Sequence, residues 1–233
     1  MTRKLAAGLA RGIKAVQRRL GMEVNRIVYM ALADAGDVYS RRADIECREI
    51  TEAEALACAA DPALELCAPG IGAAYARGDL CVGAFCQGRL VGYQWVAFGP
   101  TPDVGGVWVR FAPQTFYVYK RFVLAAFRGQ RIAATLQQEA NALARGRGCS
   151  GGVAFVSVHN AASWRAGRRD GAHTVGFAGY VRLGHFFLAL RTPGAKRKGF
   201  EFYQPGKAQL AAELAHLGHV LWTWARYWRP LRA

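Results

Sequence analysis

Residues 116–144 read FYVYKRFVLAAFRGQRIAATLQQEANALA, and this stretch says most about the fold. Its first part, up to Leu124, is rich in aromatic and β-branched residues, which predicts a β-strand. The part after Arg128-Gly129 has apolar residues at helical spacing, so the strand is expected to pass directly into a helix. The first N–H groups of a helix lack intrahelical partners and carry partial positive charge. The junction therefore predicts a site that binds phosphate.

Length and composition limit the classes of protein to which the chain can belong. Its 233 residues suit one domain with appended ends. A net charge of +15 favours an anionic partner, which is nucleic acid, an anionic membrane surface or a phosphate-bearing cofactor. Nucleic acid is the least favoured, because the arginines are scattered and no recognition motif accompanies them. No apolar run approaches the roughly 18 residues that span a bilayer.

The six cysteines contain no CxxC pair and lie scattered in apolar surroundings. This pattern predicts reduced thiols in a cytoplasmic protein, with neither a disulfide framework nor a metal site.

An N-terminal extension is expected over residues 1–40. Its first 20 residues contain six basic residues and no acid. On a helical wheel the apolar residues form one stripe opposite most of the cations: Leu5, Leu9, Ile13, Val16 and Leu20. Such a basic amphipathic helix docks on its own domain, lies in a membrane interface or serves as a transit peptide, in that order of preference. Residues 25–33 are either a first strand or the continuation of this helix.

The central domain is expected over residues 41–193. Thr51 and Glu54 have the spacing of a capping box, which predicts a helix start there. Gln87-Gly88 separates two apolar runs and predicts a hairpin. The expected elements are strands 45–50, 80–86, 89–98, 116–124 and 152–158, helices 51–60, 62–78 and 160–170, the helix after Gly129, and a final hairpin of 174–183 with 186–190. This order predicts an α+β domain with a mixed, mostly antiparallel sheet.

A C-terminal extension is expected over residues 194–233. Apolar residues recur there at alternating spacings of four and three, on one narrow helical face: Leu210, Leu214, Leu217, Leu221, Trp224 and Trp228. Packing of this face against the domain or a second copy, giving a homodimer, is the favoured interpretation. The alternative is an interfacial helix at a membrane surface, supported by neighbouring aromatic and basic residues.

Two segments resemble motifs of a known family. Residues 123–133, VLAAFRGQRIA, resemble the acyl-CoA-binding motif of the GNAT acyltransferase superfamily, and residues 160–171 are similar to its second motif. The resemblance covers roughly residues 45–191. It implies a GNAT-like fold and an enzyme that transfers an acetyl or other acyl group from acyl-CoA to the amine of a small-molecule acceptor.

The resemblance also implies where acetyl-CoA or another acyl-CoA would bind. The pantetheine arm would lie between the long strand and the buried strand, against backbone at Phe122, Val123 and Leu124. The pyrophosphate would lie on the helix start, at Arg128, Gly129, Gln130, Arg131, Ile132 and Ala133. Asn160, with Ser163 three residues later, either contacts the acyl-donor arm or caps the next helix.

The sequence departs from the family pattern in three places. Members often have glycine where Arg131 stands. The tyrosine that often protonates the leaving thiolate aligns with Gly167, and the Gly-Phe that often follows the short helix is Gly171-Ala172. These departures leave open two alternatives to the acyl-CoA-dependent enzyme. One is an acyltransferase at the membrane surface that uses long acyl chains or acyl carrier protein, and the other is a catalytically silent acyl-CoA-binding module.

The candidates for the general base are His159, at the end of the buried strand, and Tyr119 or Tyr117 on the long strand. Lys120 and Arg121, with Arg110 ahead of them, favour an anionic acceptor such as a carboxylate or a phosphorylated sugar. The expected location is the cytoplasm, with the cytoplasmic membrane surface as an alternative.

Overall fold

The computed structural model describes residues 21–32, 44–184 and 186–206. The amphipathic stripes expected in residues 1–20 and 207–233 lie outside the described residues. The strands are β1 (Met22–Ala31), β2 (Ile45–Ile50), β3 (Leu80–Cys86), β4 (Arg89–Ala97), β5 (Thr101–Pro102), β6 (Trp108–Arg110), β7 (Thr115–Val123), β8 (Gly151–Ser157), β9 (His173–Leu183), β10 (Phe186–Arg191) and β11 (Glu201–Tyr203). The helices are α2 (Glu52–Cys58), α3 (Ala68–Ala76), α4 (Ile132–Gly146), α5 (Ala161–Arg169) and α6 (Pro193–Arg197), with short 3-10 turns η1 (Pro62–Leu64), η2 (Val104–Gly106) and η3 (Ala125–Phe127).

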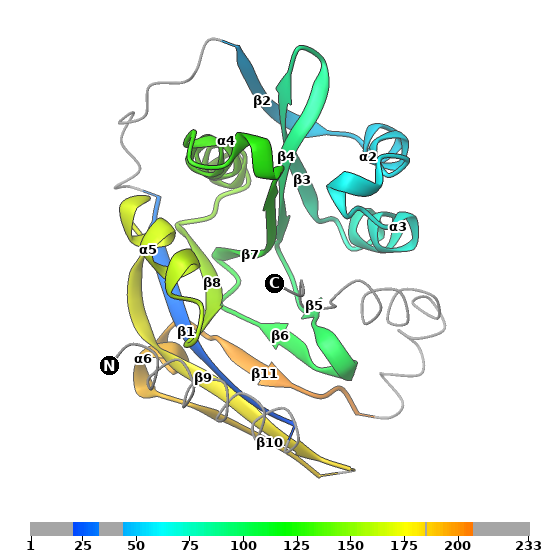
Figure 1. Ribbon diagram of the computed structural model, residues 1–233. Helices are drawn as coiled ribbons and strands as arrows, with labels where there is room; N and C mark the ends of the chain where they lie inside the picture. Colours follow the sequence, from blue (N-terminus) through cyan, green and yellow to red (C-terminus); the bar gives the residue numbers. More distant parts are fainter. Residues whose placement is uncertain (1–20, 33–43, 185, 207–233) are drawn as a thin grey trace, which may run out of the picture.

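The main sheet has eight strands in the order β10-β9-β1-β8-β7-β4-β3-β2 (Figure 1). Every neighbouring pair is antiparallel except β7 and β8, which run parallel. The α+β class and the mixed, mostly antiparallel sheet expected from the sequence are therefore confirmed.

Strand β1 lies inside the main sheet, between β8 and β9. It pairs with β8 along Asn25–Ala31 and with β9 along Met22–Tyr29. Of the two alternatives for this segment, the strand is the one that forms, because the run IVYM is buried on both sides. The expected extension 1–40 thus contains a strand of the central sheet, and its boundary at residue 40 needs correction.

A second, three-stranded sheet has the order β11-β6-β5. Phe202 of β11 pairs with Val109 of β6, and Phe200 and Phe202 pack with Tyr117 and Phe155 in a buried aromatic cluster. Residues 194–206, expected in the C-terminal extension, therefore contribute α6 and β11 to the domain. The sequence gives little sign of this, because β11 is only three residues long.

Strands β7 and β8 diverge after a short parallel contact. They pair at Thr115–Tyr117 with Gly151–Val153, and beyond that point β7 pairs with β4 while β8 pairs with β1. Tyr119 is the extra residue of a bulge, since Lys120 pairs with Trp95 and Val118 with Val96. A bulge bends its strand and increases the local twist. The central sheet consequently separates between β7 and β8 (Figure 1).

Helices cover both faces of the β2-β3-β4-β7 half. Helix α4 packs its apolar side on one face, and α2 with α3 covers the other. The capping box is confirmed: Thr51 Oγ1 accepts from the N–H of Glu54 at 3.3 Å, and the Thr51 N–H donates to Glu54 Oε2 at 2.8 Å. The hairpin at Gln87-Gly88 is also confirmed, with both residues at positive φ as a type I′ turn requires.

The passage from β7 into α4 differs from the expectation. The chain forms η3 after β7, extends through Arg128, and starts α4 only at Ile132. Gly129 and Arg131 have φ values of 79° and 63°, so two residues adopt the left-handed conformation before the helix begins. Helical periodicity locates the body of the helix but not this turn, because the turn is determined by single backbone angles.

Candidate functional site

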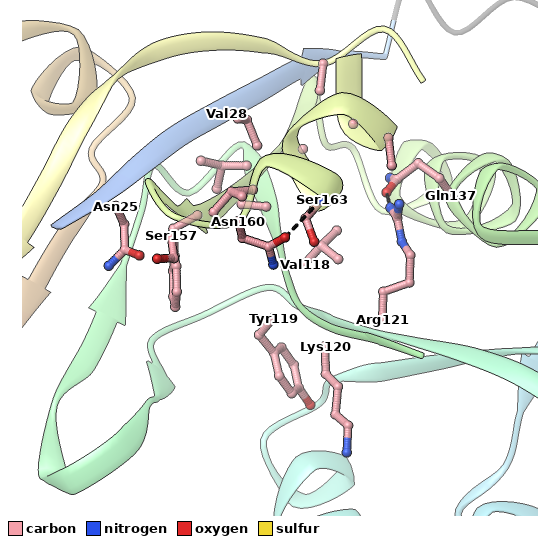
Figure 2. A pocket seen from close by; sticks show the side chains of 18 of the residues that line it. Asn25, Val28, Val118, Tyr119, Lys120, Arg121, Gln137, Ser157, Asn160 and Ser163 are labelled. Atoms are coloured by element: carbon pink, nitrogen blue, oxygen red, sulfur yellow. Dashed lines mark hydrogen bonds between the residues drawn. The ribbon is translucent and has the colours of Figure 1, made fainter. Parts of the chain in front are cut away.

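A cavity of about 530 Å³ lies where β7 and β8 diverge (Figure 2). Both strands line it, β7 with Val118 to Phe122 and β8 with Gly152 to Ser157. Helices α4 and α5 contribute Gln137 and Ser163 on one side. The cavity therefore occupies the gap where the resemblance implies a pantetheine arm.

The backbone of Val123 has polar groups that face this gap. The N–H of Leu124 donates to the Val91 carbonyl at 2.9 Å, so Leu124 faces β4. Because successive residues of a strand direct their backbone groups to opposite sides, the groups of Val123 point away from β4. The Val123 carbonyl accepts from Arg128 Nε at 3.1 Å on that open side. Of the three backbone positions expected to hold the donor, Val123 is the one oriented to do so.

A second cavity, of about 340 Å³, lies at the start of α4 and shares lining residues with the first. The shared residues are Arg121, Ala133, Ala166 and Asp170. The first N–H groups bonded within the helix are those of Ala134 and Thr135, which both donate to the Arg131 carbonyl. The earlier N–H groups lie outside the helical ladder, next to this cavity, as an anion-binding helix start requires.

Arg131 adopts the left-handed conformation without being glycine. Its φ of 63° and ψ of 10° are the angles that glycine adopts without penalty. The expected departure from the family pattern therefore changes the side chain but not the backbone path. The guanidinium adds positive charge to the second cavity, which Arg128 and Arg169 also line.

The expected donor-binding residues fall into three groups. Phe122, Asn160 and Ser163 line the larger cavity, and Val123, Arg128, Gly129, Arg131 and Ile132 line the smaller one, while Ala133 lines both. Leu124 and Gln130 line neither. Gln130 Nε2 instead donates to the Ala126 carbonyl at 3.0 Å, which stabilises the turn before α4.

Asn160 caps helix α5. Its Oδ1 accepts from the Ser163 N–H at 3.0 Å, the dashed line in Figure 2. This is the capping alternative weighed for the pair. Both residues also line the larger cavity, so capping holds the Asn160 amide at its wall.

A buried polar network behind the cavity joins four elements. Arg121 of β7 donates from Nε to Gln94 Oε1 of β4 at 2.5 Å. Its Nη2 donates to Gln137 of α4, which lies beside it in Figure 2. Its Nη1 lies 3.5 Å from Asp170 Oδ2, at the end of α5. Gln137 continues the network to Asn141 at 2.8 Å. The guanidinium expected to attract an anionic acceptor is thus held by protein groups.

Tyr119 lies at the cavity and has a fixed partner. Its hydroxyl donates to Asp79 Oδ2 at 3.0 Å, and Arg77 lies 2.6 Å from the same oxygen. Burial, with the Asp79 charge second, raises the pKa of Tyr119 well above its ordinary value. Burial also raises the pKa of Asp79, against the opposing effect of Arg77. The tyrosine therefore stays protonated and acts as a hydrogen-bond donor.

His159 is exposed at the end of β8 and is not among the residues that line the cavity. Its backbone N–H lies 3.4 Å from Ser157 Oγ. The structure brings Tyr119 to the cavity but does not bring His159 there.

Sequence analysis missed three polar residues at the opposite end of the larger cavity: Glu23, Asn25 and Asp103. Asp103 Oδ2 and Asn25 Nδ2 are buried and have no hydrogen-bond partner in the described part of the chain. Burial, with the Glu23 charge second, raises the pKa of Asp103 to about 7. The asparagine and the aspartate come from β1 and the turn after β5, whose positions no sequence motif indicates.

Within residues 21–32, 44–184 and 186–206 there is no cluster of three or more His, Cys, Asp or Glu residues that could hold a metal ion. The six cysteines all lie within the described residues, and none of them forms a disulfide bond there. Among the described residues, no helix has the length and apolar character needed to cross a membrane.

Several solved structures are similar to the chain. They include a putative GNAT acetyltransferase from Novosphingobium aromaticivorans (16% identity, 68% of this chain and 62% of that one, TM-score 0.45). Others are a GCN5-related N-acetyltransferase from Sphaerobacter thermophilus (14%, 77% and 55%, TM-score 0.48) and the aminoglycoside N-acetyltransferase AAC(6')-Iy in complex with CoA (18%, 54% and 89%, TM-score 0.44). The chain spans less than two thirds of the length of the first two.

No curated protein matches the sequence. A family model does: residues 53–172, slightly more than half of the chain, match the acetyltransferase (GNAT) family. The matched region runs from α2 to the turn before β9 and so includes β7, α4, β8 and α5. The chain therefore belongs to the GNAT acetyltransferase family.

Proposed function

We propose that this protein transfers an acetyl or other acyl group from acyl-CoA to the amine of a small-molecule acceptor. The observation that carries the proposal is the adjoining pair of cavities between β7, β8 and the start of α4, which share four lining residues. The larger cavity lies between β7 and β8, and the smaller one has the open backbone of Val123, the first N–H groups of α4 and four arginines at its wall. An acyl thioester and a pyrophosphate need these two environments side by side.

In this proposal the pyrophosphate binds the N–H groups before Ala134, with Arg128 and Arg131 adding charge. The pantetheine arm lies between β7 and β8. The Val123 N–H faces the gap and would donate to the thioester oxygen, where negative charge develops as the acceptor nitrogen attacks. Arg128 holds the Val123 carbonyl in the protein alone, so a bound donor would replace or adjust that contact.

Tyr119 is better supported than His159 as a group that transfers a proton. It lines the cavity, and its raised pKa keeps the hydroxyl protonated. To protonate a leaving thiolate, the hydroxyl would give up its hydrogen bond to Asp79 and donate to the sulfur instead. His159 remains a candidate only if a bound acceptor brings its side chain to the site.

A catalytically silent acyl-CoA-binding module is the second candidate function. Gly167 lines the cavity at the position where family members often have the acid tyrosine, so no hydroxyl comes from that site. This observation equally suits an acyltransferase that uses long acyl chains or acyl carrier protein. If the protein is a silent module, it should bind the donor without turnover. If it is a long-chain acyltransferase, its turnover should increase with the length of the acyl chain.

We further propose a cytoplasmic location with contact to an anionic membrane surface. The support is the net charge of +15 and a row of exposed apolar side chains on β10, at Phe186, Leu188 and Leu190. A homodimer through residues 207–233 remains a hypothesis from the sequence alone.

The test has two stages on the full chain. Acetyl-CoA and longer acyl-CoAs at millimolar concentration are expected to raise the melting temperature. Release of free thiol is then followed with a broad panel of amines, amino acids and amino sugars. No thermal shift with any donor would contradict the binding proposal, and a shift without thiol release from any amine would favour the silent module.

A further inference from the structure

The end of the larger cavity that faces away from α4 contains two complementary polar atoms. Asp103 Oδ2 is a hydrogen-bond acceptor and Asn25 Nδ2 a donor, and both are buried without a partner among the described residues. Asn25 is 1% exposed. A buried polar atom without a partner destabilises the folded state, so native proteins seldom keep two in one cavity unless a ligand or water satisfies them. Figure 2 shows Asn25 on the β1 side of the pocket, across from Tyr119.

A second carboxylate lies beside Asp103. Glu23 stands two residues before Asn25, so both side chains are on the same face of β1. Glu23 accepts a hydrogen bond from the Tyr180 hydroxyl, and its charge acts on Asp103. The two carboxylates therefore come from different elements and converge on one end of the cavity.

The charged and titratable groups around Asp103 leave this end acidic. They are Glu23 on β1, Tyr117 on β7, and Tyr180 and Arg182 on β9. Burial keeps the two tyrosines protonated, because it raises the pKa of each. The one cation in this group, Arg182, donates to the Gly105 carbonyl. Lys120, at the same cavity, donates to the Glu65 carbonyl at 2.9 Å.

We propose that Asp103, Glu23 and Asn25 form the acceptor site, and that the acceptor is a small amine that binds as an ammonium ion and carries an oxygen for Asn25. This inference rests on the proposed transferase function and narrows it to a cationic acceptor. It differs from the anionic acceptor expected from Arg110, Lys120 and Arg121. Arg110 pairs with Glu201 at 2.8 Å, so all three cations have protein partners.

In the proposed acyl transfer, Asp103 accepts the proton that the acceptor amine must lose before it attacks. The Asp103 carboxylate accepts one proton from the ammonium, which frees the nitrogen lone pair to form a bond with the thioester carbonyl carbon. The carbon–sulfur bond then breaks, and the thiolate leaves with a second proton from the same nitrogen, passed through Tyr119 or water. The products are the amide, CoA thiol and one proton on Asp103, which solvent removes. Burial gives Asp103 a pKa of about 7, so it can accept and release this proton near neutral pH.

The test compares wild type, Asp103→Asn and Glu46→Gln in thiol release from acetyl-CoA. The amines are ethanolamine and 3-amino-1-propanol as cations that carry an oxygen, and glutamate and 2-aminoethyl phosphate as anionic or zwitterionic probes. Asn has the shape of Asp and needs no ionised group to be buried, so the variant is expected to fold. Glu46 is a matched control, because its side chain is 70% exposed and lies outside the cavity.

We expect the wild type to prefer the cationic amines, with kcat/KM rising as pH passes through about 7. Asp103→Asn should lower kcat/KM on the order of 100-fold and abolish that rise, while the response of the melting temperature to acetyl-CoA stays unchanged. Glu46→Gln should match the wild type. A preference for the anionic probes, or an Asp103→Asn variant with wild-type kcat/KM and pH profile, would overturn the acceptor site.

A direct binding measurement separates this inference from the proposed function. Calorimetric titration of ethanolamine and 3-amino-1-propanol into the CoA-loaded protein should give binding that Asp103→Asn weakens at least tenfold. If the amines bind in this way but no thiol is released, the acceptor site stands and the transferase function fails. If neither amine binds and the anionic probes do, the acceptor site fails while the transferase function remains.

Discussion

At the scale of single residues, Asp103 makes the stability of the protein depend on pH. Burial raises its pKa in the folded protein to about 7, whereas the unfolded chain has the ordinary value near 4. The folded state therefore holds a proton that the unfolded state has lost. The contribution of Asp103 to the free energy of unfolding is fully present below about pH 4 and is lost as the pH rises to about 7.

Asp103→Asn removes this dependence. Urea unfolding at pH 5 and pH 8 measures the free energy of unfolding of both proteins. The difference between the variant and the wild type should shift in favour of the variant by on the order of 2 kcal/mol from pH 5 to pH 8, a figure reduced to allow for the partial exposure of Asp103. The lowered pKa values of Asp61 and Glu54 belong to groups that titrate below this range. An equal difference between the two proteins at both pH values would contradict the buried carboxylate.

Tyr119→Phe separates a catalytic hydroxyl from a structural one. The phenol is expected to protonate the leaving thiolate, so the variant should lose about 10²-fold in kcat with little change in KM for acetyl-CoA. Tyr75→Phe is the matched control, since its hydroxyl also makes a partly buried hydrogen bond, to the Ile50 carbonyl at 2.5 Å, outside the cavity. If both variants have the same kcat, the Tyr119 hydroxyl takes no part in the reaction.

Residue-level expectations succeeded where a local pattern determines the contact. The Thr51 and Glu54 capping box depends on three-residue spacing, and the structure shows both of its hydrogen bonds. Asp103 could not be found in this way, because its burial depends on a turn and on β1, which lies 80 positions earlier. The partners of Arg121 could not be found from the sequence for the same reason: a cation within a strand does not indicate that Gln94 and Gln137 surround it.

At the scale of elements, the Arg121 network is expected to hold β4, β7, α4 and α5 together behind the cavity. Arg121→Met would leave Gln94, Gln137 and Asp170 without their shared partner, and we expect a loss of about 3 kcal/mol in the free energy of unfolding. Urea denaturation measures this loss.

Arg110→Met provides the comparison for that variant. It removes an exposed pair with Glu201, which keeps Arg191 at 3.1 Å, so the expected loss is at most about 1 kcal/mol. If the two variants lose the same stability, the buried network is not what joins these elements.

Most helices and strands could be located from periodicity and turn residues, whereas the order of strands could not. The hairpin at Gln87-Gly88 follows from two adjacent residues that tolerate positive φ. The place of β1 between β8 and β9 depends on contacts far apart in sequence, as does the pairing of β11 with β6. Sequence therefore located the proposed donor site, which lies on consecutive elements, and did not locate the proposed acceptor site, which does not.

At the scale of the whole molecule, charge and exposed apolar surface predict association with anionic membranes. The net charge is +15, and Phe186, Leu188 and Leu190 lie exposed on the edge strand β10, with Phe186 at 55% and Leu190 at 62%. Flotation with phosphatidylserine vesicles should recover the protein at low salt, recover less at high salt, and recover none with neutral vesicles.

Two variants locate the contact. If flotation persists after deletion of residues 1–20 but is lost in Phe186→Ser/Leu190→Ser, β10 makes the membrane contact. If flotation is lost after the deletion but persists in Phe186→Ser/Leu190→Ser, residues 1–20 make the contact. No recovery of the wild type with anionic vesicles at low salt would end the membrane proposal.

The central claim is that acyl-CoA binds at the start of α4, and calorimetric titration of acetyl-CoA tests it most directly. Gly129→Ala and Gly148→Ala are a matched pair, because both glycines have φ of 79° and open space around a Cβ, but only Gly129 lines the cavity. Each alanine should cost about 1–2 kcal/mol of stability. We predict wild-type Kd for Gly148→Ala and a Kd at least tenfold weaker for Gly129→Ala; equal Kd values for the two variants, or no binding by the wild type, would contradict the account.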